Sequence, residues 1–303
     1  MAKKTALILS GGGAKGAFQC GAEKYAREVL GYRWDIIAGV SVGALNGVML
    51  AMQKFERLFE VWNTISNEQV YTGGFNLRSL IGVLFGAKSF YKNAPLRLML
   101  EKEFEPEKIQ GELLIGAVSL QTGEYVQFRQ GFPQLSEAVM ASTVMPVIWE
   151  PLDVSPEYLS MVDGGVRNIS PIGDVLQFEP DELVIINCSA EVGSPLPKPP
   201  PNLLKIGVRT LDLLLNELFM GDLREFLHIN HLVLQAAQHN LTLYHPVSGR
   251  PLKYYPYRII EPDFPLGDTL DFSQPTVQRS LRHGGEKAKQ VFAGKLEETS
   301  QNF

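Results

Sequence analysis

A single segment, Trp34-Asp35-Ile36-Ile37-Ala38-Gly39-Val40-Ser41-Val42-Gly43-Ala44-Leu45-Asn46-Gly47, sets the architecture expected of this chain. Its apolar residues lead into a glycine-flanked turn and then into helix-favouring residues, which predicts a strand, a tight turn and the start of a helix. Ser41 lies on the turn, between Gly39 and Gly43. These glycines let the backbone reverse without a Cβ clash, so the Ser41 hydroxyl should project at the helix N-terminus, where free N–H groups favour negative charge. An ordinary Gly/Ser turn has the same pattern, so the rest of the chain has to decide.

The composition is that of a folded globular protein. The chain has 303 residues, 45% of them apolar and 20% charged, which suits one large α/β domain or two modest ones. The formal net charge is −5 and no long basic run occurs, which argues against a nucleic-acid surface and leaves local contact with a membrane open. Cys20 and Cys188 form no disulfide framework, so we expect small core residues in a protein of a reducing compartment.

The beginning of the chain has only a superficial likeness to a secretory signal. Met1-Ala2-Lys3-Lys4 is basic, but the apolar run that follows, residues 5–9, ends at a glycine cluster and is too short for a signal peptide. No stretch is long and apolar enough for a transmembrane helix. We therefore expect a cytoplasmic protein that is at most peripheral at a membrane, and we leave open export without a cleaved signal.

A glycine-rich loop follows the first expected strand. Residues 5–9 form a short apolar run typical of a buried strand, and Ser10-Gly11-Gly12-Gly13-Ala14-Lys15-Gly16 connects it to a helix expected from about 17 to 30. A loop of this kind at a helix N-terminus offers backbone N–H groups to an anion.

Two nucleotide-binding interpretations compete for this loop. Gly11, Gly13 and Gly16 fit the dinucleotide pattern G-x-G-x-x-G, but Asp35 stands at the start of the second strand, whereas the pattern needs an acidic residue at its end. A P-loop needs Gly-Lys-Ser/Thr, whereas here Lys15 precedes Gly16 and no hydroxyl residue follows. Both interpretations are weakened.

The remaining chain alternates helices and strands. We expect helices from about 42 and over 55–65, 136–142, 202–239 and 274–292, strands over 158–162, 183–188 and 258–260, and a hairpin of 113–120 with 124–129. Residues 71–93 are either a cap or mobile lid beside an apolar cleft, or plain core packing. A stiff proline-rich connector spans 194–201. The long helix after it presents an apolar stripe to the core or to a membrane.

Three pieces together suggest a catalytic constellation. The glycine loop follows the first strand, Ser41 follows the second, and Asp163 ends a later strand before Gly164-Gly165. A serine nucleophile needs a base and an oxyanion site, which these pieces could supply. As the base, Asp163 would need desolvation to raise its pKa toward neutrality. The alternative interpretation of Asp163 is an aspartate that only forms the turn before the two glycines.

In these residues the chain resembles the patatin-like phospholipase family, of the bacterial type with a single patatin domain. The resemblance rests on Gly11-Gly12-Gly13-Ala14-Lys15-Gly16, on the Ser41 turn and on Asp163-Gly164-Gly165. Further matches are Ala141-Ser142-Thr143-Val144-Met145-Pro146, Asn168 and Pro171. It runs from about Lys4 to Ile172 with the motifs in the family's order, and continues to Gly285 only in general pattern.

The resemblance implies a three-layer α/β/α fold with a central, mainly parallel sheet, as one domain over 4–285 with a C-terminal tail at 286–303. It implies a serine acyl hydrolase without metal or other cofactor, cleaving phospholipids, lysophospholipids or related lipid esters. Ser41 would be the nucleophile and Asp163 the base of a Ser–Asp dyad that forms an acyl-enzyme. The N–H groups of Gly11, Gly12, Gly13 and Val42 would hold the oxyanion. Lys15 would steer anionic head groups, or else brace the loop.

Two rival functions remain beside this one. An α/β-hydrolase triad could be written as Ser41, Asp163 and either His283 or His245, but only one strand precedes the serine strand here. No His/Cys cluster has metal-ligand spacing, so no zinc is expected. A non-enzymatic lipid- or dinucleotide-binding module could use the same glycine loop, but it gives no reason for the serine.

Overall fold

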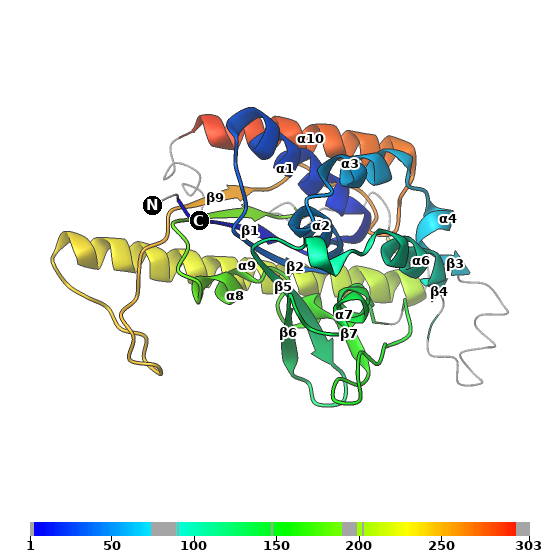
Figure 1. The fold of residues 1–303 in the computed structure, drawn as a ribbon, viewed down its shortest axis with the longest axis horizontal. Helices are drawn as coiled ribbons and strands as arrows, with labels where there is room; N and C mark the ends of the chain where they lie inside the picture. Colours follow the sequence, from blue (N-terminus) through cyan, green and yellow to red (C-terminus); the bar gives the residue numbers. More distant parts are fainter. Residues whose placement is uncertain are drawn as a thin grey trace.

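The computed structural model describes residues 3–73, 89, 91–146, 148–189, 199–201 and 203–294. Within them a seven-stranded sheet runs in the order β6-β5-β2-β1-β8-β9, with β7 paired to β5 (Figure 1). Its strands are β1 (Thr5–Leu9), β2 (Ile36–Val40), β5 (Glu112–Ser119), β6 (Tyr125–Arg129), β7 (Met161–Asp163), β8 (Glu182–Ile186) and β9 (Tyr257–Ile260). A separate small ribbon pairs β3 (Thr72–Gly73) with β4 (Tyr91–Lys92).

The sheet is mainly parallel, as expected. Strand β1 pairs in parallel with β2 and β8, β2 with β5, and β8 with β9. The predicted hairpin is confirmed as the antiparallel pair of β5 and β6. Every residue of β1, β2 and β8 is buried, which explains why these strands are continuous apolar runs rather than alternating ones.

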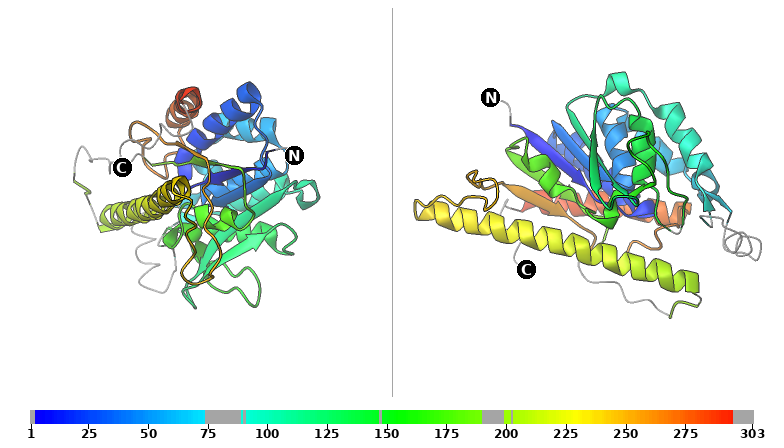
Figure 2. Two further views of the ribbon diagram at one scale, coloured as in Figure 1. Left: turned by 90° about the vertical axis from the view of Figure 1, so that its left-hand side faces the viewer. Right: turned by 90° about the horizontal axis from the view of Figure 1, so that it is seen from below.

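Helices cover both faces of the sheet, which confirms the three-layer fold (Figures 1 and 2). One face carries α1 (Gly16–Leu30), α2 (Val42–Ala51), α3 (Phe55–Thr64), α7 (Leu135–Ser142) and α10 (Gln274–Ala293). The other carries α8 (Ile172–Leu176) and the long α9 (Leu203–Gln238). The structure also describes the shorter elements α4 (Asn67–Val70), α6 (Ala94–Glu103), η1 (Gly13–Lys15), η2 (Pro106–Lys108) and η3 (Gly164–Val166).

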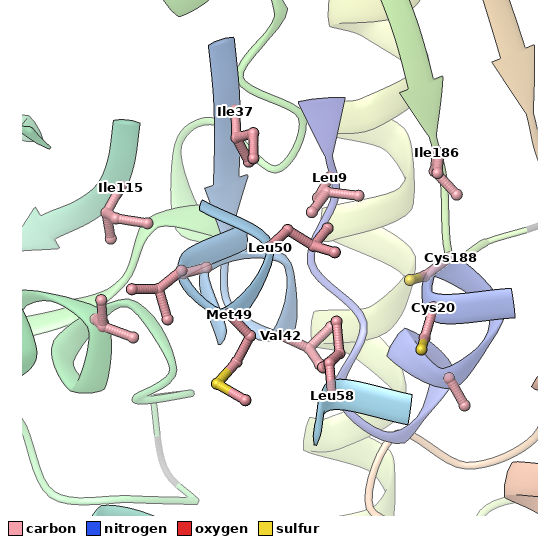
Figure 3. Close-up of a cluster of buried hydrophobic side chains, with 14 of the residues drawn as sticks. Leu9, Cys20, Ile37, Val42, Met49, Leu50, Leu58, Ile115, Ile186 and Cys188 are labelled. Atoms are coloured by element: carbon pink, nitrogen blue, oxygen red, sulfur yellow. The ribbon is translucent and has the colours of Figure 1, made fainter. Parts of the chain in front are cut away.

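The core follows the alternation of side chains along the strands. Leu7 and Leu9 of β1 face the layer of α1 and α2, whereas Ala6 and Ile8 face α9. Figure 3 shows Leu9, Ile37 and Ile115 of β1, β2 and β5 beside α2, and Ile186 of β8 beside Cys20 and Cys188. The two cysteines lie in the same cluster, both buried and free, as predicted. Burial raises the pKa of the Cys188 thiol to about 12.

Several predicted segments differ from the structure or fall outside the described residues. The strand expected over 158–162 spans only Met161–Asp163, so Asp163 belongs to the strand itself. Helix α10 continues to Ala293, so residues 286–293 are helical rather than part of a tail. Most of the expected cap at 71–93 and of the connector at 194–201 lies outside the described residues. None of the helices that the structure describes is long and apolar enough to span a membrane.

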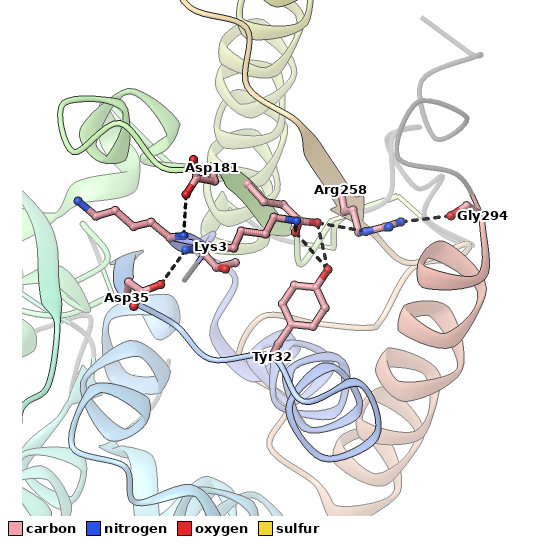
Figure 4. Close-up of polar contacts among 9 residues, drawn as sticks. Lys3, Tyr32, Asp35, Asp181, Arg258 and Gly294 are labelled. Atoms are coloured by element: carbon pink, nitrogen blue, oxygen red, sulfur yellow. Dashed lines mark hydrogen bonds and ion pairs between the residues drawn. The ribbon is translucent and has the colours of Figure 1, made fainter. Parts of the chain in front are cut away.

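A buried ion cluster ties the N-terminal segment, β8 and β9 together (Figure 4). Glu182 on β8 is fully buried, and its carboxylate pairs with Arg258 of β9 at 3.3 Å and with Lys3 at 2.5 Å. The Tyr32 hydroxyl donates a hydrogen bond to the same carboxylate at 3.1 Å. Arg258 also donates to the Gly294 carbonyl after α10.

Replacing Arg258 with methionine is expected to lower the free energy of unfolding by about 2–4 kcal/mol. The substitution leaves the buried Glu182 carboxylate with Lys3 as its remaining cation, and the Lys3 side chain is 53% exposed. Urea unfolding near neutral pH measures the change. Arg33→Met is the matched control, because Arg33 is exposed, and equal stabilities of the two variants would contradict the prediction.

Candidate active site

Ser41 lies on a strained turn between β2 and α2, as the sequence predicts. It is the N-cap of α2 and has φ 59° and ψ −128°, a positive-φ conformation that a non-glycine residue adopts only at a cost. The flanking glycines are required, since a Cβ on Gly39 would lie 2.2 Å from the Gly43 carbonyl oxygen. A Cβ on Gly43 would lie 2.2 Å from the Leu9 carbonyl oxygen. The turn therefore fits against β1 only with these two glycines.

Ser142, the last residue of α7, holds this turn in place. Its hydroxyl accepts a hydrogen bond from the Ser41 N–H at 2.9 Å and donates one to the Gly116 carbonyl of β5 at 2.6 Å. Ser142 is fully buried. The sequence places it in a segment shared with the family but does not indicate this contact, which joins residues about a hundred positions apart.

Asp163 lies beside Ser41 at the end of β7. The residue is 6% exposed, and its carboxylate accepts a hydrogen bond from the Gly165 N–H at 2.8 Å. Asp163 and Ser41 line the same pocket. Burial raises the pKa of the Asp163 carboxyl to about 6, and the nearby Ser41 side chain and the Gly165 N–H oppose the rise. The structure thus brings the two predicted dyad residues together and supplies the desolvation that the aspartate needs.

The glycine loop lies beside Ser41, but its three amides differ. The Gly11 N–H donates to the Ile169 carbonyl at 3.1 Å. It is therefore not free to hold an oxyanion, contrary to the prediction. The N–H groups of Gly12 and Gly13 have no acceptor in the part of the chain that the structure describes. Gly13 has φ +56° and packs so closely that a Cβ would lie 2.3 Å from the Thr269 carbonyl oxygen. Val42 is the first residue of α2, so its N–H has no intrahelical acceptor.

Two pockets meet at Ser41, one with an almost entirely apolar lining and one, called the polar pocket below, in which charged and polar side chains join apolar ones. An apolar cavity of about 90 Å³ is lined by Ser41, by Val42 and Met49 of α2, by α3 and by α6. A polar pocket of about 40 Å³ holds Asp163 and Lys15 on the other side. The Lys15 ammonium has no ion-pair partner among the described residues.

The rival sites find little support. His283 packs on the Phe264 ring at 4.3 Å and accepts a hydrogen bond from the Asp263 N–H, while His245 caps its own loop. Neither lines the pockets at Ser41. The Asp35 carboxylate accepts the Thr5 N–H at 2.8 Å, so it holds β1 rather than facing the glycine loop. No group of three metal-binding side chains occurs within the described ranges.

The sheet, the glycine-flanked serine turn and the adjacent buried aspartate define an α/β protein with a strained serine turn between a strand and a helix. A family model for patatin-like phospholipase matches residues 7–176, more than half of the chain, and this protein belongs to that family. Among solved structures, the chain is similar to VipD from Legionella pneumophila, with 11% sequence identity and a TM-score of 0.43. The alignment covers 97% of this chain and 67% of VipD.

Proposed function

We propose that this protein is a lipid acyl hydrolase that cleaves the esters of phospholipids, lysophospholipids or related lipids through Ser41 and Asp163. The observation that carries the proposal is the placement of a serine on a strained turn beside a buried aspartate, where an apolar cavity meets a polar pocket. Membership of the patatin-like family supports the same reaction class.

The first half of the reaction follows from this geometry. Asp163 accepts the proton of the Ser41 hydroxyl as the serine oxygen attacks the ester carbonyl. The N–H groups of Gly12, Gly13 and Val42 stabilise the oxyanion, at about 3 kcal/mol per donor in comparable sites. Asp163 then protonates the leaving alcohol, and the acyl group stays on Ser41.

The two pockets suit the two parts of a lipid ester. The apolar cavity would take the acyl chain, because its lining is almost entirely hydrophobic. The polar pocket would take the leaving alcohol, and the Lys15 ammonium there would attract an anionic head group. Exposed leucines on α9, Leu213, Leu214 and Leu218, favour peripheral contact with a lipid surface next to this pocket.

Met99→Trp tests the assignment of the acyl cavity. Met99 on α6 lines the apolar cavity, and the larger ring should fill part of it. We expect kcat/KM for p-nitrophenyl decanoate to fall about tenfold relative to p-nitrophenyl acetate, since several methylenes lose their burial. The substrate ratio is measured within one preparation, so a partial loss of folded protein does not alter it.

Leu98→Trp is the matched control on the same helix. Leu98 is 67% exposed and does not line the cavity, so this variant should keep the wild-type ratio. An unchanged ratio in Met99→Trp would reject the cavity as the acyl site. The proposed function would be rejected if the wild-type protein hydrolysed none of these substrates: neither of the two p-nitrophenyl esters nor a lysophospholipid.

A further inference from the structure

The polar pocket beside Asp163 is closed on one side by α9. Leu215, Asn216 and Phe219 of this helix line the pocket together with Ser41 and Asp163. The helix passes beneath the sheet at this point, on the face opposite α1 and α10 (Figure 2). Residues of α9 lie beyond the part of the chain that the family model matches, so the family motifs do not account for them.

Asn216 brings an unsatisfied acceptor to this pocket. Its Oδ1 atom is buried and has no hydrogen-bond partner among the described residues. Phe219 and Leu223, which are almost fully buried, hold this part of α9 against the sheet, so the helix keeps Asn216 beside the pocket. A buried carbonyl oxygen without a donor is unfavourable, and native structures usually supply such a group with a partner from protein, ligand or water.

The pocket has the size and polarity of a water site. Its volume is about 40 Å³, whereas a cavity needs only about 10–15 Å³ to hold one water molecule. The partner of Asn216 must donate a hydrogen bond, because Oδ1 is only an acceptor. Asp163 lines the same pocket and, once ionised, is also an acceptor. A water molecule has two O–H groups and can donate one to each.

We infer that Asn216 positions the water molecule that hydrolyses the acyl-enzyme on Ser41. The inference rests on the proposed function, because it assigns a residue to the second half of that reaction. The space that the leaving alcohol vacates is the polar pocket, and a water entering it would be held between Asp163 and Asn216. With both protons directed at these acceptors, a lone pair of the water oxygen is free to face the acyl carbon.

The step balances without another reactant. The water oxygen forms a bond to the acyl carbon as one of its protons passes to the Asp163 carboxylate. The second proton stays on the attacking oxygen and is directed at Asn216. The bond between the acyl carbon and the Ser41 oxygen then breaks, Asp163 returns the proton to that oxygen, and the carboxylic acid leaves. Asn216 contributes orientation and is neither protonated nor deprotonated.

The test compares the two half-reactions in wild type and in Asn216→Leu, which removes the acceptor at similar volume. With p-nitrophenyl acetate, the release of p-nitrophenol in the first turnover reports acylation, and the steady state reports hydrolysis of the acyl-enzyme. We expect the variant to hydrolyse the acyl-enzyme about tenfold more slowly, the effect of one lost hydrogen bond. An acetyl adduct on Ser41 should accumulate and be visible by intact-mass spectrometry.

Two controls separate positioning from a structural effect. Glu217→Gln changes the next residue of α9, whose side chain is 75% exposed, and should behave as wild type. Hydroxylamine is a strong nucleophile that depends less on orientation, so it should restore turnover of the variant acyl-enzyme more than it accelerates the wild type. Asn216→Ala replaces the leucine variant if leucine prevents folding.

The outcomes are distinct. Slow hydrolysis of the acyl-enzyme with an accumulating adduct supports the inference. Equal loss of both half-reactions without an adduct, or wild-type rates in both Asn216 variants, overturns it and leaves the proposed function standing. A wild-type protein that forms no acyl adduct and releases no p-nitrophenol overturns the proposed function and this inference together.

Discussion

Ser41→Ala is expected to abolish ester hydrolysis, lowering kcat by about 10,000-fold or more. The substitution removes the hydroxyl that forms the acyl-enzyme in the proposed reaction and leaves the backbone turn, the glycines and the proposed oxyanion donors unchanged. Alanine and serine both carry a Cβ, so the strain at φ 59° is the same in both proteins. The free energy of unfolding should therefore change by less than about 1 kcal/mol. Loss of activity in a folded protein would locate the effect in the chemistry.

The measurement is intact-mass spectrometry after incubation with a fluorophosphonate, together with turnover of a lysophospholipid. One adduct is expected on the wild type and none on Ser41→Ala. Ser280→Ala is the matched control, because Ser280 is fully buried in α10 and its hydroxyl has no partner among the described residues. That variant should label and turn over normally. Labelling or turnover retained by Ser41→Ala would exclude Ser41 as the nucleophile.

The sequence predicts the features of the site and fold that depend on residues close together in the chain. Gly39 and Gly43 make the turn at Ser41 recognisable because the backbone there admits no Cβ, and this requirement is visible within a few residues. The buried strands β1, β2 and β8 were recognisable for a related reason: strands covered on both faces become continuous apolar runs.

Other features of the site depend on contacts between distant segments, so they could not be predicted from the sequence. Nothing in the glycine loop indicates that the Gly11 N–H is taken by the Ile169 carbonyl, because the two meet only in the folded chain. The support of Ser41 by Ser142 is of the same kind. No sequence pattern indicates a role for Asn216, because its helix has the ordinary apolar stripe of a packed helix. Only the fold places its amide in the same pocket as Asp163.

Asp163→Asn is expected to lower kcat by about 1,000-fold or more, because an amide cannot accept the Ser41 proton. In the wild type, the same role predicts that kcat/KM rises about tenfold per pH unit below a pKa of about 6 and levels off above it, since only the ionised carboxylate acts as the base. A pH profile with a soluble ester measures this. A flat profile between about pH 5 and 8 would contradict the role of Asp163 as the base.

The same substitution should stabilise the protein at high pH. Burial raises the pKa of Asp163 from its ordinary value of 3.8 to about 6, so between these values the folded state binds more protons than the unfolded state. The contribution of Asp163 to the stability of the wild type then falls as pH rises through this window, and above it the buried charge costs about 3 kcal/mol. Asparagine never ionises and can still accept the Gly165 N–H. We therefore expect urea unfolding to show the two proteins equally stable near pH 4 and the variant more stable near pH 8. A variant that is less stable near pH 8 would show that the carboxylate stabilises the fold rather than being held there for catalysis.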